Sequence, residues 1–264
     1  MSRPIRIGVQ IQPQQAPKYG LIRDAVLRAE DVGVDVVFNW DHFYPLYGDP
    51  DGAHFECWTM LGAIAEQTER VRLGALVTGG GYRNPDLLAD MARTVDHISG
   101  GRLILGLGAG WFERDYDEYG YEFGTAGTRI DKFKDSLARI TDRLARLNPP
   151  PVGPMPILIG GGGERKTLRL VADYADIWHT FADLEVLQRK SKILAEHCAV
   201  VGRDPALIER SVQWPGAEAA GALAAAGVTL FTVGVGGPDY DLSAVVEAIG
   251  WRDDYNPEPV TGIA

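Results

Sequence analysis

The sequence predicts a single α/β domain over residues 1–264, folded as a parallel (β/α)8 or TIM barrel. The chain has 264 residues, close to the roughly 250 typical of such a barrel. Eight strand-like apolar runs alternate with about eight amphipathic segments. Parallel strands need crossover helices, and eight such units close naturally into a barrel. An open doubly wound sheet is the competing arrangement.

The strands are predicted from short apolar runs. In residues 5–11, Ile5, Ile7 and Val9 occupy one face and should pack outward against helices, so that Gln10 and Gln12 face the barrel mouth. The seven later runs cover residues 34–40, 71–78, 100–110, 157–163, 175–181, 207–214 and 228–235.

The helices are predicted from apolar residues three and four positions apart. The longest pattern covers residues 129–147, and the proline-rich segment 148–156 after it is a connector because a strand follows at once. The other predicted helices cover residues 20–32, 55–69, a segment beginning at Pro85, 164–175, 183–200, an alanine-rich stretch before residue 228, and 241–249.

Composition limits the partners. The formal net charge of −10 disfavours nucleic acid and anionic membrane, which both need a basic face, and leaves a small molecule as the expected partner. Cys57 and Cys198 are far apart in helical segments, so we expect no disulfide and a cytoplasmic setting. No secretory signal core and no run of about 18 apolar residues is evident.

Polar side chains and glycines gather at the predicted strand ends, where barrels of this kind carry their sites. Asp41 and His42 follow the second strand, and His179 ends the sixth. An imidazole beside a carboxylate suits proton transfer, because the ordinary pKa of histidine lies near neutrality. The alternative is loop charge with a helix-capping role.

Three glycine-rich stretches have different meanings. Residues 160–167, GGGGERKT, place four glycines before a basic helix start, which predicts a phosphate cradle. Residues 106–110, GLGAG, lack the full dinucleotide fingerprint because position 111 is Trp, although such glycines can also make room for a planar ring. In residues 77–85, Arg83 either binds a phosphate or carboxylate bidentately or is a solvated loop residue.

Other chemistries find little support. His54, His97 and His179 do not show the spacing of metal ligands, so we expect no metal site. The nucleophile elbow GxSxG is absent, which disfavours a hydrolase.

Taken together, these stretches resemble the luciferase-like monooxygenase superfamily, in its F420-dependent oxidoreductase branch. The matching residues are WDHF with PLYGDPDG, the segment from AEQTERVRLGALVTGGGYRNP to GGRLILGLGAGWFERDY, and ILIGGGGERKTLRLVADYAD. The resemblance covers most of residues 5–180 and is loose beyond.

The resemblance implies an enzyme that binds the deazaflavin coenzyme F420 at the barrel mouth and exchanges a hydride with a small organic substrate. It also implies a non-prolyl cis peptide near residues 75–76. We expect His42 to give or take the proton, or to hydrogen-bond the substrate oxygen, and Asp41 to orient His42. The implied coenzyme contacts are Asp41, His42, Leu76, Val77, Thr78, Ala109, Gly110, Trp111, Gly161, Gly162 and Gly163. Members of the family commonly form homodimers.

The sequence also departs from the sugar-phosphate dehydrogenases of this branch. Leu46 stands where they have Trp, and Gln14 and Gln15 stand where they supply an acid, which argues against glucose 6-phosphate as substrate. The segment before residue 148 is shorter than usual, which changes the lid. Two alternatives stay open: an FMN-dependent two-component monooxygenase, and an F420-binding protein without turnover.

Overall fold

The predicted TIM barrel is confirmed. The structure, a computed structural model, describes residues 3–256. Its strands form one closed parallel sheet, in which β3 and β4 together fill a single position between β2 and β5. The strands are β1 (Arg6–Ile11), β2 (Val36–Asn39), β3 (Arg72–Ala75), β4 (Thr78–Gly79), β5 (Leu103–Gly108), β6 (Ile157–Gly160), β7 (Ile177–Thr180), β8 (Glu209–Gln213) and β9 (Val228–Val235).

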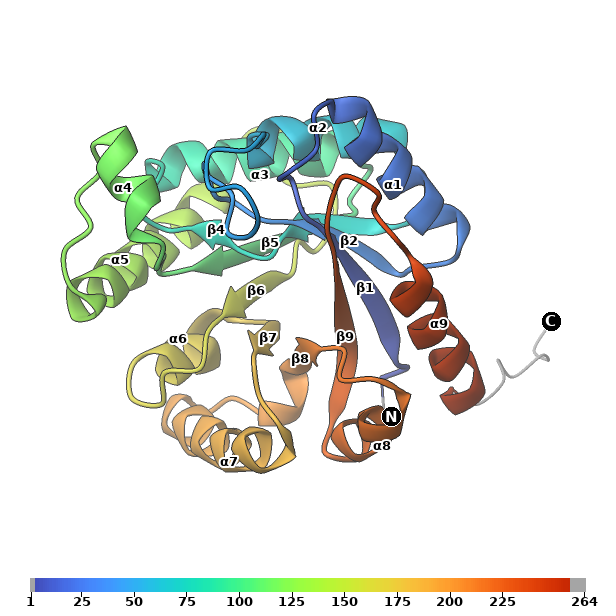
Figure 1. The fold of residues 1–264 in the computed structure, drawn as a ribbon. Coiled ribbons are helices and arrows are strands. Elements are labelled where there is room, and N and C mark those ends of the chain that lie inside the picture. Colours follow the sequence, from blue (N-terminus) through green and yellow to red (C-terminus); the bar gives the residue numbers. More distant parts are fainter. Residues whose placement is uncertain (1–2, 257–264) are drawn as a thin grey trace.

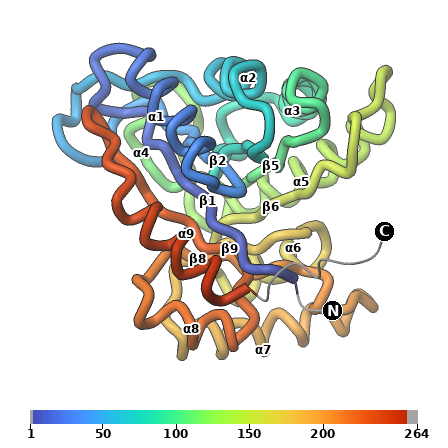
Figure 2. The backbone as a smooth tube through the Cα atoms, turned by 90° about the vertical axis from the view of Figure 1, so that its right-hand side faces the viewer, coloured from blue at the N-terminus to red at the C-terminus, as the bar shows by residue number. Residues whose placement is uncertain are grey.

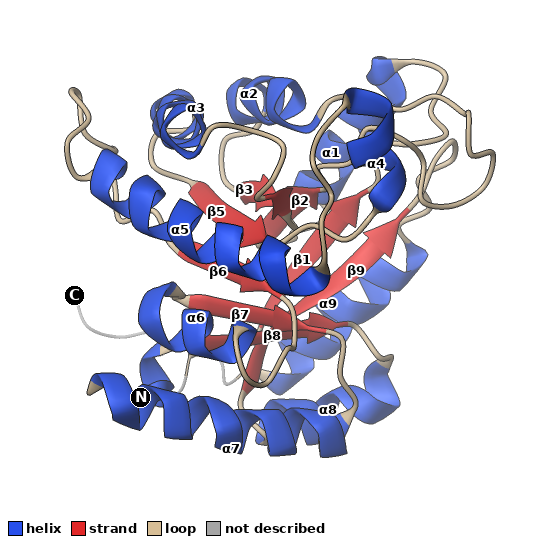
Figure 3. Cartoon of the chain, turned by 90° about the vertical axis from the view of Figure 1, so that its left-hand side faces the viewer, coloured by secondary structure: helices blue, strands red, loops and turns tan. Residues whose placement is uncertain are grey.

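Helices enclose the sheet on its outer side (Figure 1 and Figure 3). They are α1 (Tyr19–Asp31), α2 (Cys57–Gln67), α3 (Pro85–Ile98), α4 (Glu113–Tyr119), α5 (Ala126–Leu144), α6 (Thr167–Tyr174), α7 (Leu184–Val201), α8 (Ala217–Ala225) and α9 (Ser243–Tyr255), with a 3-10 turn at Pro205–Leu207. The sequence analysis did not predict α4. The first and last described strands, β1 and β9, pair side by side and complete the ring (Figure 2).

Two apolar layers fill the barrel. Ile5, Ile7 and Val9 belong to the large layer between strands and helices, as predicted. The interior holds a smaller cluster of fully or almost fully buried side chains, and Leu76 and Val77 pack against it. Its members are Val36, Phe38, Ile104, Leu158, Ile177 and Leu230. This inner cluster is the floor on which a site at the strand ends can be built.

The strand predicted for residues 71–78 is interrupted. Leu76 and Val77 separate β3 from β4, and the peptide bond between them is cis, one residue beyond the expected position near 75–76. Gln10 Nε2 donates to Leu76 O over 2.6 Å. A Cβ atom at Gly108 or Gly160 would lie 2.6 or 2.9 Å from the Val77 side chain. These two strand-end glycines therefore leave room for Val77.

Two further expectations concern the whole chain. Cys57 and Cys198 are both free thiols and both buried. Within residues 3–256, no helix combines the length and the apolar character that a membrane crossing would require.

Candidate active site

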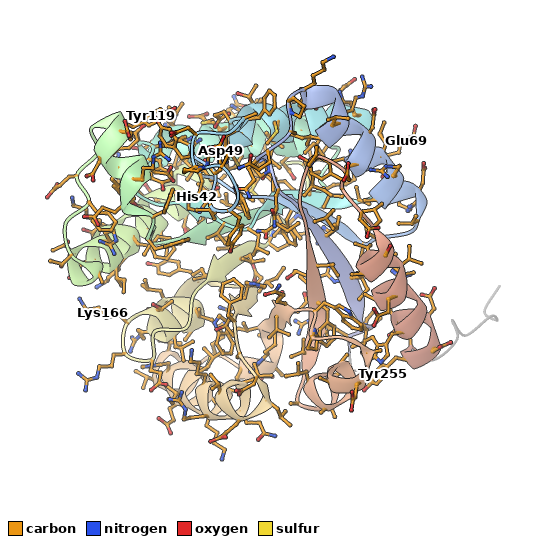
Figure 4. All side chains as sticks on the ribbon, viewed as in Figure 1. His42, Asp49, Glu69, Tyr119, Lys166 and Tyr255 are labelled. Atoms are coloured by element: carbon orange, nitrogen blue, oxygen red, sulfur yellow. The ribbon has the colours of Figure 1, made fainter. Side chains whose placement is uncertain are left out.

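A cavity of about 620 Å³ opens at the carboxyl ends of the strands, where the sequence analysis expected the site. His42 and the glycine turn after β6 both line it, so the two ends of the predicted site lie together (Figure 4 labels His42). The predicted site residues that line this cavity are Asp41, His42, Leu76, Val77, Ala109, Gly110, Trp111, Gly161 and Gly162.

Two predicted contacts lie elsewhere. Thr78 is fully buried, and its Oγ1 accepts a hydrogen bond from Trp58 Nε1 at 3.1 Å. The alternation of side chains along the chain turns Thr78 away from the cavity, whereas Val77 lines it. Gly163 lines a neighbouring recess instead of the main cavity.

The imidazole of His42 is held by Asp115, the residue that sequence analysis missed. His42 Nδ1 and Asp115 Oδ2 are 2.7 Å apart. Asp115 is fully buried on α4 and also accepts from the Tyr82 hydroxyl at 2.9 Å and from the backbone N–H groups of Phe43 and Tyr44 at 3.0 and 3.2 Å. Four donors thus converge on one carboxylate.

This arrangement fixes the role of each ring nitrogen. A carboxylate that already accepts from three donors is an acceptor for the fourth, so we assign the Nδ1 hydrogen of His42 to the bond with Asp115. Nε2 is then the ring nitrogen available to a molecule in the cavity. Trp40, Trp111 and Phe112 surround the imidazole in edge-to-face contacts, with ring centres 5.5–6.1 Å from it.

The prediction that Asp41 orients His42 is wrong. Asp41 Oδ2 and Oδ1 accept from Arg83 Nη1 and Nη2 at 2.5 and 3.1 Å, and Gly79 N donates to Oδ2 at 3.3 Å. Asp41 and His42 are adjacent in the sequence but reach different partners, Arg83 and Asp115.

Of the two interpretations of Arg83, the carboxylate-binding one is confirmed, since both terminal nitrogens bond Asp41, a carboxylate of the protein itself. Arg83 is not a solvated loop residue. It also bonds Glu56 at 2.5 Å, so it holds two carboxylates. Burial alone would lower the pKa of Arg83, but Asp41 and Glu56 raise it above the ordinary value. Arg83 therefore stays charged and compensates the buried Asp41.

The opposite wall of the cavity carries little charge. Burial lowers the pKa of His179 to about 4, so its imidazole is neutral at pH 7 and shares a 2.9 Å hydrogen bond with Ser211 Oγ. Gln12, Gln213 and Thr232 add uncharged polar groups. This wall can hydrogen-bond a ligand without supplying a counter-ion for an anion.

Positive charge instead lies at the glycine turn. Gly161 has φ of 134°, a conformation that favours glycine, and its N–H and C=O bond His179 O and Trp178 Nε1 at 3.0 and 2.7 Å. Thr180 Oγ1 and Lys190 Nζ both lie against Gly162, in the space that a side chain there would occupy. The turn thus combines a closely approachable backbone, a hydroxyl and an ammonium, which suit a phosphate.

Sequence reasoning did not find Lys190 or Thr180. Lys190 belongs to α7 and Thr180 ends β7, and only folding brings them to the turn. Among residues 3–256, no group of three or more His, Cys, Asp or Glu side chains is arranged to hold a metal ion.

The fold and site define a luciferase-like barrel. The profile of the luciferase-like monooxygenase family matches residues 1–222, and the chain belongs to this family.

Curated relatives match part of their length. An F420-dependent glucose-6-phosphate dehydrogenase of Amycolatopsis mediterranei is 29% identical over 197 residues, which are 65% of this chain and 54% of that protein. A phthiodiolone/phenolphthiodiolone dimycocerosates ketoreductase of Mycobacterium sp. (strain JLS) is 35% identical over 184 residues, 61% of this chain and 47% of that one. The chain spans less than two thirds of the length of these relatives.

Solved structures share the fold more completely. An F420-dependent secondary alcohol dehydrogenase in complex with an F420-acetone adduct superimposes with a TM-score of 0.79 at 19% identity, over 91% of this chain and 96% of that one. The coenzyme F420-dependent tetrahydromethanopterin reductase of Methanopyrus kandleri gives 0.71 at 16% identity, over 94% and 98%. At these identities the likeness concerns the fold alone.

Proposed function

We propose that the protein is an oxidoreductase that transfers a hydride between coenzyme F420 and a small uncharged organic substrate. One observation carries the proposal: an oriented imidazole and a cationic glycine turn open into the same cavity. F420-dependent enzymes among the curated relatives and among the structures of the same fold support this choice of coenzyme.

The residues of the cavity fit such a coenzyme. The phosphate would be held at the turn by the backbone N–H of Gly162 with Thr180 and Lys190, because these groups present donors and positive charge at one place. A flat apolar ring needs apolar surface, which Leu76 and Val77 supply above the inner cluster, with Ala109 as their neighbour in the cavity wall.

His42 would handle the proton. When bound, F420 supplies hydride exchange at the carbon of its central ring. His42 Nε2 takes the proton from a substrate hydroxyl in the oxidative direction and returns it to a carbonyl oxygen in the reductive one. Asp115 is a positioning residue in this scheme, because it acts by holding the Nδ1 hydrogen and the ring orientation.

The substrate we propose carries no negative charge at its reacting end. The charged side chains of the described residues near that end are paired with one another: Asp41 with Arg83, and Asp115 with His42 and the Tyr82 hydroxyl. The cation that lines the cavity, Lys190, is at the glycine turn. A sugar phosphate would therefore lack a counter-ion beside His42, whereas a ketone, aldehyde or secondary alcohol would need none.

Titration of the protein with F420 and FMN, followed by turnover assays, tests the proposal. We expect tighter binding of F420 than of FMN, and coenzyme absorbance changes with uncharged alcohols or carbonyl compounds but not with sugar phosphates. Binding of FMN alone would favour the monooxygenase alternative. Binding of F420 without turnover on any of these compounds would favour a coenzyme-binding protein. Faster turnover of glucose 6-phosphate would contradict the proposed substrate class.

A further inference from the structure

Three exposed aromatic side chains stand at the mouth of the main cavity: Tyr47, Trp111 and Phe181. Their exposed fractions are 65%, 63% and 77%. Among the described residues these are the three most exposed aromatic side chains, and all three line the cavity, whereas the next two, Tyr119 and Tyr255, do not. Exposed apolar side chains that gather at one place mark a binding surface. We call Tyr47, Trp111 and Phe181 the aromatic rim.

The aromatic rim surrounds the mouth because its members come from loops spaced around the barrel. Tyr47 follows β2, Trp111 follows β5 and Phe181 follows β7. With β3 and β4 counted as one position, three positions separate β2 from β7 in either direction around the closed sheet. Tyr47 and Phe181 therefore come from opposite sides of the barrel, and Trp111 comes from between them. A group that fills the mouth can contact rings on more than one side.

Each rim side chain is supported by a second ring deeper in the cavity wall. The ring centres are 5.6–6.2 Å apart, and the partners are Trp40 for Tyr47, His42 for Trp111 and His179 for Phe181. These contacts orient the rim rings but leave more than half of each side chain exposed. The remaining aromatic surface is available to a ligand that reaches His42.

We propose that the aromatic rim holds an aromatic ring of the substrate, so that the enzyme acts on aryl ketones and aryl secondary alcohols; this inference rests on the proposed function. His42 sets the position of the reacting oxygen inside the cavity. A substituent on the reacting carbon that points out of the cavity then meets the rim. Aromatic rings attract one another in offset-stacked or edge-to-face arrangements, beyond the effect of the apolar area that they bury. A methyl group in the same place would leave the rim in water.

The rim acts on binding because the aromatic ring of the substrate takes no part in the reaction. In the reductive direction the C=O double bond becomes a single bond. The carbonyl carbon receives a hydride from reduced F420, and the oxygen receives a proton from His42 Nε2. The products are the secondary alcohol and the oxidised coenzyme. We therefore expect the preference for aryl substrates to appear mainly in KM.

Initial rates with acetophenone, cyclohexyl methyl ketone and acetone, at saturating reduced F420, test the inference. We expect kcat/KM for acetophenone to exceed that for acetone roughly 100-fold, with the cyclohexyl ketone between them. The double variant Tyr47→Ala/Phe181→Ala should reduce this advantage by about tenfold and change the Kd for F420 by less than about twofold. Calorimetric titration with acetophenone should show the same loss of affinity. Trp111 is kept in this variant because it also contacts His42.

Tyr255→Ala is the matched control, because Tyr255 is an exposed aromatic residue on α9 that does not line the cavity (Figure 4). This variant should keep the full advantage of acetophenone. Equal kcat/KM for acetophenone and acetone would overturn the inference, and so would an advantage that survives in the double variant. A Kd for F420 that rises about tenfold in the double variant would assign the rim to the coenzyme and overturn the inference as well.

These outcomes differ from a failure of the proposed function. Turnover of acetone without a preference for acetophenone leaves the proposed function standing and removes the role of the rim. If the protein reduced none of the three ketones, the proposed function itself would be contradicted, and the inference with it.

Discussion

His42→Ala is expected to lower kcat by roughly 10²–10⁴-fold, the usual contribution of a positioned acid–base group. The Kd for F420 should change by less than about threefold, because in the proposed complex the glycine turn, Lys190 and the apolar wall hold most of the coenzyme. Steady-state kinetics with a coenzyme titration of the same preparation measure both quantities. The variant should still fold, because loss of the imidazole leaves the buried Asp115 carboxylate with three other hydrogen-bond donors.

Two companion variants make this result specific. His97→Ala removes an exposed imidazole that contacts Pro150 O and does not line the cavity, so kcat should stay within about twofold. Asp115→Asn should fall between the two, with a lower kcat and an unchanged Kd for F420, because it weakens the hold on His42 and Tyr82 but removes no group at the glycine turn. A His42→Ala protein with wild-type kcat would remove His42 from the proposed chemistry.

Lys190→Met is expected to weaken coenzyme binding and to leave kcat nearly unchanged, the reverse of the result for His42→Ala. It should raise the Kd for F420 by roughly 10- to 100-fold, the range that a charged hydrogen bond of about 1.5–3 kcal/mol implies. At saturating coenzyme, kcat should stay within about twofold, because Lys190 lies at the glycine turn and His42 at the reacting end. Fluorescence titration and kinetics at high coenzyme concentration check the two halves.

Lys192→Met, on the same helix, is the control and should bind F420 as the wild-type protein does. If Lys190→Met left the Kd unchanged, the phosphate would not lie beside Lys190. If it lowered kcat as much as His42→Ala, the separation of binding and chemistry in the cavity would be wrong.

The sequence predicts the barrel well because strand and helix periodicities are strong over long segments. The alternation in β1 correctly assigns Val9 to the outer layer and Gln10 to the cavity. The sequence does not predict local departures from these periodicities. The third strand is interrupted at Leu76 and Val77. The residues that surround this break, Gln10, Gly108 and Gly160, belong to three other strands, so the local sequence does not reveal it.

The sequence predicts where the site lies, but not which side chains are hydrogen-bonded to one another within it. The rule that sites gather at the carboxyl ends of barrel strands correctly indicated that His42 lines the cavity. Its partner Asp115 lies on α4, a helix of 7 residues in an aromatic-rich stretch without clear periodicity. Proximity in sequence suggested Asp41 instead, but Asp41 pairs with Arg83, and no local pattern distinguishes the two carboxylates.

A crystal structure of the protein with F420 tests the central claim most directly. We predict that the deazaflavin ring lies in the main cavity against Leu76 and Val77, within reach of His42 Nε2. The phosphate should contact Lys190 and the backbone of Gly162. A coenzyme bound outside this cavity, or a phosphate placed away from the glycine turn, would contradict the account.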